Sequence, residues 1–125
     1  MKKFLLLAII MLSCISIVAQ EDQEQATLVK GNWTATYYGD RYKGSRRNAN
    51  GEPFDMNAMT CAAPRQFPFG TRLRVTNTAN GKSVVVRVCD RPAPGHTIID
   101  LTHGAFGKIA NHRTGRVYVK VEILK

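Results

Sequence analysis

Residues 72–89 read RLRVTNTANGKSVVVRVC, and this stretch decides the expected fold. Two runs of strand-forming residues flank an Asn-Gly dipeptide at residues 80–81, which is typical of a tight hairpin turn. Alternate residues of a strand point to the same face. Three valines of the second run therefore share one apolar face: Val84, Val86 and Val88. We expect an antiparallel hairpin with one face in the core.

Strand patterns continue on both sides of this hairpin. Residues 33–38 are rich in aromatic and β-branched side chains, and residues 117–124 alternate apolar with mostly polar positions. The five prolines stand between the strand-like runs, where a missing N–H donor does least harm. Short strands separated by turn signals predict a mainly β protein that closes into a small barrel.

One short helix is expected after residue 102. The Thr102 hydroxyl is a suitable N-cap, and Ala105, Phe106 and Ile109 follow at helical spacing on one face. The chain has 125 residues, which suits one modest domain, and we place that domain at residues 30–125.

The N-terminus has the pattern of a secretory signal peptide. Lys2 and Lys3 precede an almost unbroken apolar run over residues 4–18, which is short for a membrane span. We expect residues 1–19 to be removed on export to the periplasm or outer envelope, with no stable membrane insertion afterwards; an uncleaved anchor is the alternative. The polar residues 20–29 are interpreted as a linker.

The cysteines leave two questions open. Cys14 lies in a segment that weakly resembles a lipoprotein cleavage site, so a lipid anchor on Cys14 is the alternative to plain secretion. Removal of residues 1–19 leaves Cys61 and Cys89 in an oxidising compartment. They are a candidate disulfide, and two buried thiols are the alternative.

The domain is strongly basic. Residues 30–125 hold 16 Lys and Arg against six Asp and Glu, a formal balance of +10. Such a charge favours anionic partners, which in a bacterial envelope include peptidoglycan with its peptide carboxylates and anionic lipid. Export argues against nucleic acid as a partner. The histidines lack the spacing of a metal site, and no cofactor-binding motif is present, so we expect neither metal nor cofactor. We also expect a monomer.

The acidic residues are few, so each is a candidate for chemistry. They are Asp40, Glu52, Asp55, Asp90, Asp100 and Glu122. Asp90 ends an apolar strand and precedes Arg91 and a proline-rich loop, a position that favours facing a groove. The alternative for Asp90 is a pair with Arg91 or a turn cap. Asp100 has mostly apolar neighbours and is interpreted as structural, paired with an arginine.

Taken together, these motifs resemble the rare lipoprotein A family of RlpA-like domains. Five stretches match in order and cover nearly all of residues 31–124: ATYYG at 35–39, ANGEPFD at 49–55, FPFGT at 67–71 with RVTN at 74–77, NGKSVVVRV at 80–88, and DR at 90–91 with IIDL at 98–101.

The resemblance implies a six-stranded double-psi β-barrel with one or two short helices, a fold shared with expansins. It also implies a peptidoglycan lytic transglycosylase, which cleaves the bond between N-acetylmuramic acid and N-acetylglucosamine without water and leaves a 1,6-anhydro end. By the same resemblance, Asp90 matches the catalytic aspartate and Glu52 the assisting glutamate. The expected partner is the peptidoglycan glycan strand.

Further residues are assigned to substrate binding. Tyr37 and Tyr38 are candidates for stacking on sugar rings, with core packing as the alternative, and Arg91 and Asp55 are candidates beside the two acids. One position departs from the family: Pro64 stands where active members usually carry a histidine. This departure keeps open a second function, an expansin-like module that binds or loosens glycan without cutting it. An inhibitor or partner protein of the envelope is a third.

Overall fold

The computed structural model describes residues 24–38, 46–91 and 95–125. The expected signal peptide at residues 1–19, including Cys14, lies outside the described residues. No helix within the described ranges is long and apolar enough to cross a membrane.

The hairpin expected from residues 72–89 is confirmed. Strand β4 (Arg72–Asn77) pairs antiparallel with β5 (Ser83–Asp90). Gly81 in the connecting turn has φ of +74°, a conformation that glycine adopts without strain. The three valines of β5 point inward and are at most 8% exposed. Local alternation and turn chemistry therefore determine this element.

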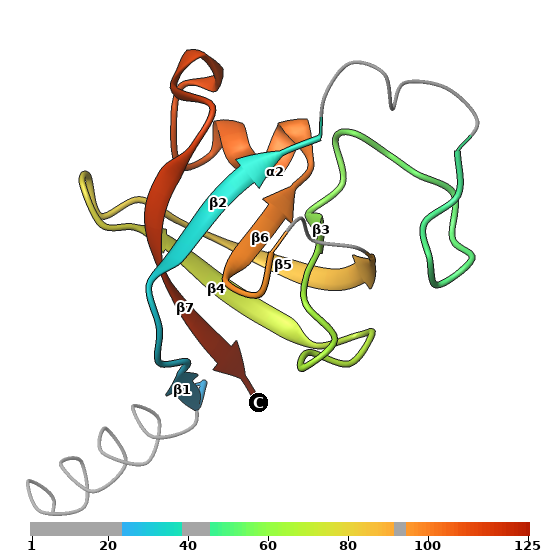
Figure 1. Ribbon diagram of the computed structural model, residues 1–125, viewed down its shortest axis with the longest axis horizontal. Coiled ribbons are helices and arrows are strands. Elements are labelled where there is room, and N and C mark those ends of the chain that lie inside the picture. Colours follow the sequence, from blue (N-terminus) through green and yellow to red (C-terminus); the bar gives the residue numbers. More distant parts are fainter. Residues whose placement is uncertain (1–23, 39–45, 92–94) are drawn as a thin grey trace, which may run out of the picture.

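A closed barrel of six strands forms around the hairpin (Figure 1). Strand β7 (Val117–Leu124) pairs with β4 on one edge and with β2 (Trp33–Tyr37) on the other. The remaining strands are β3 (Thr60–Ala62) and β6 (Ile98–Leu101). The order around the ring is β7-β2-β6-β3-β5-β4, and β4 closes on β7. Two of the pairs are parallel, β2 with β6 and β3 with β5. The expected six-stranded barrel is confirmed.

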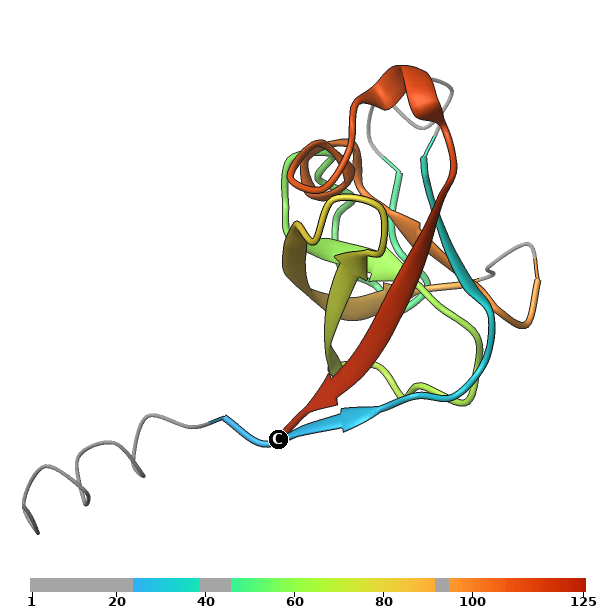
Figure 2. The same ribbon diagram turned by 90° about the vertical axis from the view of Figure 1, so that its left-hand side faces the viewer.

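A seventh strand lies outside the ring. Strand β1 (Ala26–Leu28) pairs antiparallel with the last residues of β7. Figures 1 and 2 both show it beside the C-terminus. The pairing differs from the linker that we expected at residues 20–29. The strand forms because β2 pairs with β7 only as far as Val119. The backbone N–H and C=O groups on that edge of β7 after Val119 would otherwise lack hydrogen-bond partners.

The core fills the barrel and continues under two short helices. Leu73, Val86 and Val121 are at most 1% exposed inside the ring. Helix α2 (His103–Gly107) begins at the expected N-cap, because the Thr102 hydroxyl accepts the Ala105 N–H at 3.1 Å. The 3-10 helix η2 (His112–Thr114) follows, and the two helices lie together at one end of the barrel (Figure 2).

The two cysteines are free, buried thiols in the structure, which is the alternative to the candidate bridge. Cys61 belongs to the core cluster and pairs in register with Val88, which also points into the barrel. The register between β3 and β5 shifts at this point, because Cys61 pairs with Val88 and Ala62 with Asp90, so Cys89 is the extra residue of a β-bulge. Both cysteines are buried, and the Cys89 sulfur lies 3.9 Å from the Cys61 carbonyl oxygen.

Candidate active site

Asp90 ends β5, as the sequence indicates, but it does not face an open groove. Asp90 is buried, with 1% of its surface exposed. The reason is a turn at residues 48–52 that folds over the end of β5, where the Asn50 N–H donates to the Cys89 carbonyl at 3.2 Å. The expectation of a solvent-facing carboxylate at this position is therefore wrong for the structure described.

Four groups surround the buried Asp90 carboxylate. The Tyr38 hydroxyl donates to Oδ2 at 2.7 Å, and the Arg46 guanidinium lies 3.5 Å from the same oxygen. The main-chain N–H groups of Ala49 and Arg91 donate to Oδ1 at 2.7 and 2.9 Å. A buried carboxylate is tolerated when it is paired and hydrogen-bonded in this way. The carboxylate is therefore held in one orientation.

Tyr38 positions this carboxylate and is largely covered. It is 7% exposed, and its ring stacks on Phe54 with centroids 5.0 Å apart and planes at 12°. The Arg46 guanidinium lies 5.8 Å from the same ring. Burial, together with the hydrogen bond to Asp90, raises the pKa of Tyr38 far above its usual range. Tyr38 is therefore a permanent hydrogen-bond donor to Asp90.

Asp100 is a second carboxylate beside Asp90, and we had interpreted it as structural. The small residue Ala62 in β3 pairs with Asp100 in β6 on one side and with Asp90 in β5 on the other. Neighbouring strands lie about 4.8 Å apart, so the two aspartate Cα atoms are separated by roughly 10 Å. The Thr36 hydroxyl of β2 donates to Asp100 Oδ1 at 2.9 Å.

The environment of Asp100 suits proton transfer. Burial raises its pKa to about 6 from an ordinary value of 3.8, and the negative charge of Asp90 adds to the shift. The hydrogen bond from Thr36 and the charge of Arg46 act in the opposite direction. Asp100 is only partly buried, unlike Asp90. Among carboxyl groups in active sites, a raised pKa is a common feature of a general acid.

Glu52 lies in the turn that covers Asp90. Its carboxylate forms a bidentate ion pair with the Arg87 guanidinium of β5, at 3.0 and 2.7 Å. The hydrogen bond from Arg87 lowers the pKa of Glu52. The turn closes through the Asn48 N–H, which donates to the Glu52 carbonyl at 2.8 Å. One turn thus carries both the ion pair and the Ala49 N–H that holds Asp90.

Arg91 contacts the site through its backbone and flanks it through its side chain. Its guanidinium donates to the carbonyls of Phe67 and Asp90, and it lies 4.5 Å from the ring centroid of Phe69. The ion pair that we considered between Asp90 and Arg91 is therefore replaced by one with Arg46. Phe69 is 46% exposed and was missed in the sequence because one aromatic residue in a loop carries no periodic signal.

Two residues assigned to substrate binding lie elsewhere. The Tyr37 hydroxyl donates to the His112 carbonyl at 2.8 Å, and its ring packs 4.7 Å from that of Phe106. Asp55 accepts the Asn57 N–H at 2.9 Å in an exposed turn. Neither contact reaches the aspartate pair.

Pro64 is buried, and its carbonyl accepts the Phe67 N–H at 3.0 Å. A proline side chain has no titratable group. Within the part of the chain that the structure describes, no group of three or more His, Cys, Asp or Glu side chains could hold a metal ion.

The closed six-stranded barrel with its two parallel pairs is a double-psi β-barrel. Solved structures support this class. The Streptomyces papain inhibitor is 26% identical, with a TM-score of 0.62, covering 81% of this chain and 96% of that one. An apo expansin from Clavibacter michiganensis is 20% identical, with a TM-score of 0.61, covering 81% of this chain and 51% of that one. The expansin likeness concerns the fold.

A family model described as lytic transglycolase matches residues 31–121, and the chain belongs to this family. The probable endolytic peptidoglycan transglycosylase RlpA of Synechocystis sp. is 49% identical over 98 residues, covering 78% of this chain and 30% of the relative. The endolytic peptidoglycan transglycosylase RlpA of Neisseria meningitidis is 47% identical, covering 70% and 36%. The chain thus spans about a third of these two relatives. An uncharacterized Synechocystis protein, 48% identical, is covered over 92% of its length.

Proposed function

We propose that this protein is a peptidoglycan lytic transglycosylase that cleaves the bond between N-acetylmuramic acid and N-acetylglucosamine and leaves a 1,6-anhydro end. The observation that carries the proposal is the pair Asp90 and Asp100 on either side of Ala62. Family membership and the names of the relatives support the choice of polymer. We expect the protein to act as a monomer outside the cytoplasm, where peptidoglycan lies.

The reaction needs one proton donor that becomes a proton acceptor. A carboxylic acid protonates the glycosidic oxygen as the bond from the muramic acid C1 to that oxygen breaks through an oxocarbenium-like transition state. The sugar's own 6-hydroxyl then forms a bond to C1, and its proton returns to the carboxylate. No water is consumed, and the carboxylic acid is regenerated.

Asp100 is our candidate for this acid, because it is partly exposed and its pKa lies near 6. Asp90 is our candidate for the fixed negative charge that supports the oxocarbenium-like centre. This assignment revises the role that the family resemblance implied for Asp90. The reason for the revision is that an aspartate with 1% exposure is poorly placed to hand a proton to a polysaccharide.

The test is digestion of peptide-free glycan strands, with mass analysis for anhydro ends. Asp90→Asn and Asp100→Asn should each lower product formation by at least about a hundredfold, the usual contribution of a general acid or base. Glu24→Gln is the matched control, because this surface carboxylate forms an ion pair with Arg72 and does not contact Asp90 or Asp100. Full activity in either aspartate variant would reject the mechanism.

Glu52 is assigned a positioning role through its ion pair with Arg87. If the pair holds the turn that covers Asp90, Glu52→Gln and Arg87→Met should lower kcat by similar factors, and the double variant should lose little more. KM should change less than kcat. A loss confined to Glu52→Gln would instead indicate direct contact with the substrate.

The second candidate function is a glycan-binding module without catalysis. Pro64 favours it, because this position lacks the histidine usual in active members of the family. The same digestion separates the two functions: a native protein that sediments with glycan but releases no anhydro product is a binding module.

A further inference from the structure

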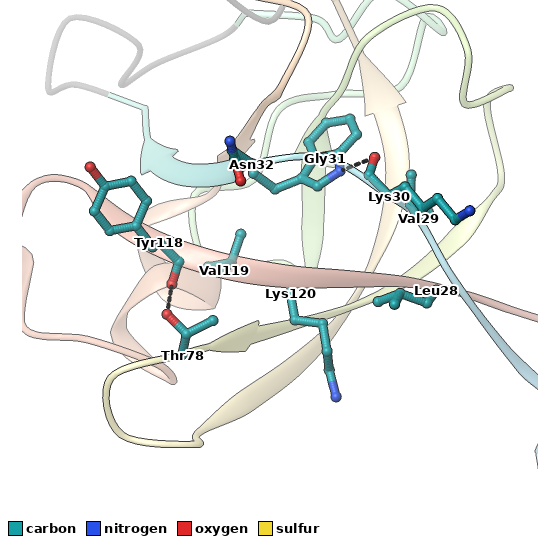
Figure 3. A pocket seen from close by; sticks show the side chains of 10 residues that line it. Leu28, Val29, Lys30, Gly31, Asn32, Thr78, Tyr118, Val119 and Lys120 are labelled. Carbon is teal, nitrogen blue, oxygen red and sulfur yellow. Dashed lines mark hydrogen bonds between the residues drawn. The ribbon is translucent and has the colours of Figure 1, made fainter.

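An open groove of about 860 Å³ lies on the outside of the barrel at the start of β2 (Figure 3). Neither Asp90 nor Asp100 is among the residues that line it. One wall is the segment 28–32, which joins β1 to β2, and the other side is formed by Thr78 and the beginning of β7. Trp33 begins β2 and Tyr38 follows its end, so the groove and Tyr38 are separated by roughly 16 Å along the strand.

The wall formed by residues 28–32 is held in place by the fold. The Val29 N–H donates to the Val121 carbonyl at 2.9 Å, and the buried Trp33 donates from Nε1 to the Lys30 carbonyl at 3.2 Å. Gly31 has φ of +131°, and a Cβ there would lie 3.2 Å from Trp33 Nε1. The groove is therefore a formed feature of the barrel with a fixed glycine in its wall.

Two exposed apolar side chains line this groove, one toward each end (Figure 3). Tyr118 is 73% exposed and Leu28 is 58% exposed. Among the described residues, three large hydrophobic side chains are exposed, and these are two of them. Exposed apolar side chains that line a concave surface are typical of a binding site.

The groove is also basic. Lys30 and Lys120 line it and are exposed. Glu122 lies 3.7 Å from Lys120, but it is shared with Arg74 of β4 at the same distance. This face therefore keeps a net positive charge, because it carries three cationic side chains, Lys30, Lys120 and Arg74, against the one carboxylate of Glu122.

These features favour one kind of ligand. An exposed tyrosine offers an apolar face on which a sugar ring stacks, and the Asn32 and Thr78 side chains offer amide and hydroxyl groups to sugar hydroxyls. The lysines complement carboxylates. The surface is concave, whereas an anionic lipid surface is better matched by protruding apolar side chains. A polysaccharide that carries carboxylates has this chemistry, as peptidoglycan with intact stem peptides does.

We propose that this groove is a second, non-catalytic site that binds peptide-bearing peptidoglycan. The Tyr118 ring stacks on a sugar, and Lys30 and Lys120 pair with carboxylates of the peptide stems. The proposal rests on the proposed function for the identity of the polymer. In this proposal the groove binds regions of the wall that still carry stem peptides, and the aspartate pair cleaves the glycan.

Co-sedimentation with purified insoluble sacculi tests the groove, in the Asp100→Asn background so that the polymer stays uncut. Tyr118→Ala and the double variant Lys30→Gln/Lys120→Gln should each weaken binding at least fivefold, while Tyr118→Phe should bind normally. Sacculi stripped of peptides by an amidase should bind the parent protein at least fivefold more weakly. The matched control is Lys82→Gln/Lys108→Gln, which removes two exposed lysines outside the groove.

Three results would overturn the proposal: normal binding by the Tyr118→Ala and double-lysine groove variants, an equal loss in the Lys82/Lys108 control, or equal binding to stripped sacculi. Binding to phosphatidylglycerol vesicles, measured with the same variants, tests whether the groove binds a membrane instead. If Tyr118→Ala loses vesicle binding but keeps sacculus binding, the groove is a membrane site. Failure of the proposed activity is distinguishable, because the native protein would then release no anhydro ends while groove-dependent sedimentation persists.

Discussion

At the scale of single residues, burial gives two similar aspartates different environments. Asp90 is enclosed by Tyr38, Arg46 and two main-chain N–H groups, so its charge is satisfied and its orientation is set. Asp100 keeps partial exposure, and it accepts a hydrogen bond from the Thr36 hydroxyl. Its raised pKa has a consequence for stability, because the folded protein holds the Asp100 proton more tightly than the unfolded chain.

Asp100→Asn should stabilise the protein at neutral pH while it removes activity. Ionising Asp100 costs folding free energy as the pH rises from about 4 to 6, and the cost persists above that range. The shift in pKa corresponds to about 2–3 kcal/mol, and Asn can still accept the hydrogen bond from Thr36. Urea unfolding at pH 4 and pH 7.5 measures this. An equal difference between variant and parent at both pH values would contradict the prediction.

The pH dependence of cleavage should follow Asp100. A general acid works in its protonated form, and the protonated fraction of a group with pKa near 6 falls about tenfold per pH unit above that value. We therefore expect kcat/KM for anhydro product to decline above about pH 6. Initial rates between pH 4.5 and 8.5 provide the measurement, within the range where circular dichroism shows the barrel folded. A rate that is flat from pH 6 to 8 would exclude Asp100 as the acid.

At the scale of elements, short connections determine how the site is assembled. Helix α2 has five residues, and isolated helices of that length are not stable in water, so it depends on its cap and on packing. Thr102 supplies the cap and also donates to the Ala58 carbonyl at 2.6 Å. One buried hydroxyl thus joins the helix to the segment that leads from the 48–52 turn into β3.

Thr102→Ala should destabilise the protein by about 1–2 kcal/mol, since it removes the N-cap and leaves the Ala58 carbonyl without this donor. Thr102→Ser keeps the hydroxyl and should recover most of the loss. Chemical denaturation of both variants beside the parent measures the difference. Equal destabilisation by Ser and Ala would show that the methyl group, and not the hydroxyl, makes the contribution.

At the scale of the whole molecule, a neutral apolar core lies inside a strongly basic surface. The ring of six strands buries its valines and leucines, while the charge of +10 over residues 30–125 lies mostly at exposed or partly exposed positions. Electrostatics therefore acts mainly between the molecule and its partners, and the core accounts for most of the stability.

Binding to sacculi should weaken steeply with salt, while stability should change little. The screening length falls from about 10 Å at 0.1 M to about 3 Å at 1 M salt, so exposed lysines lose most of their attraction for wall carboxylates. Sedimentation and urea unfolding in parallel at 0.05, 0.15 and 0.5 M NaCl separate the two quantities. Sacculus binding that is unaffected by 0.5 M NaCl would show that charge contributes little.

Local patterns were enough to predict much of the barrel. The hairpin followed from alternating valines and an Asn-Gly turn, and α2 followed from Thr102 and the spacing of Ala105 and Phe106. These features depend on residues within a few positions of each other. The resemblance to a known family then supplied the double-psi arrangement, which periodicity by itself does not specify.

The sequence by itself determined the elements and their inward faces, because side-chain period and turn chemistry are properties of neighbouring residues. Only the tertiary structure decided which strands lie side by side. That arrangement buries Asp90 beneath a distant turn, places Asp100 across Ala62 from it, and attaches β1 to the exposed edge of β7. Each of these outcomes depends on pairing between segments far apart in the chain, where the free energy is gained from burial and hydrogen bonds that no local pattern encodes.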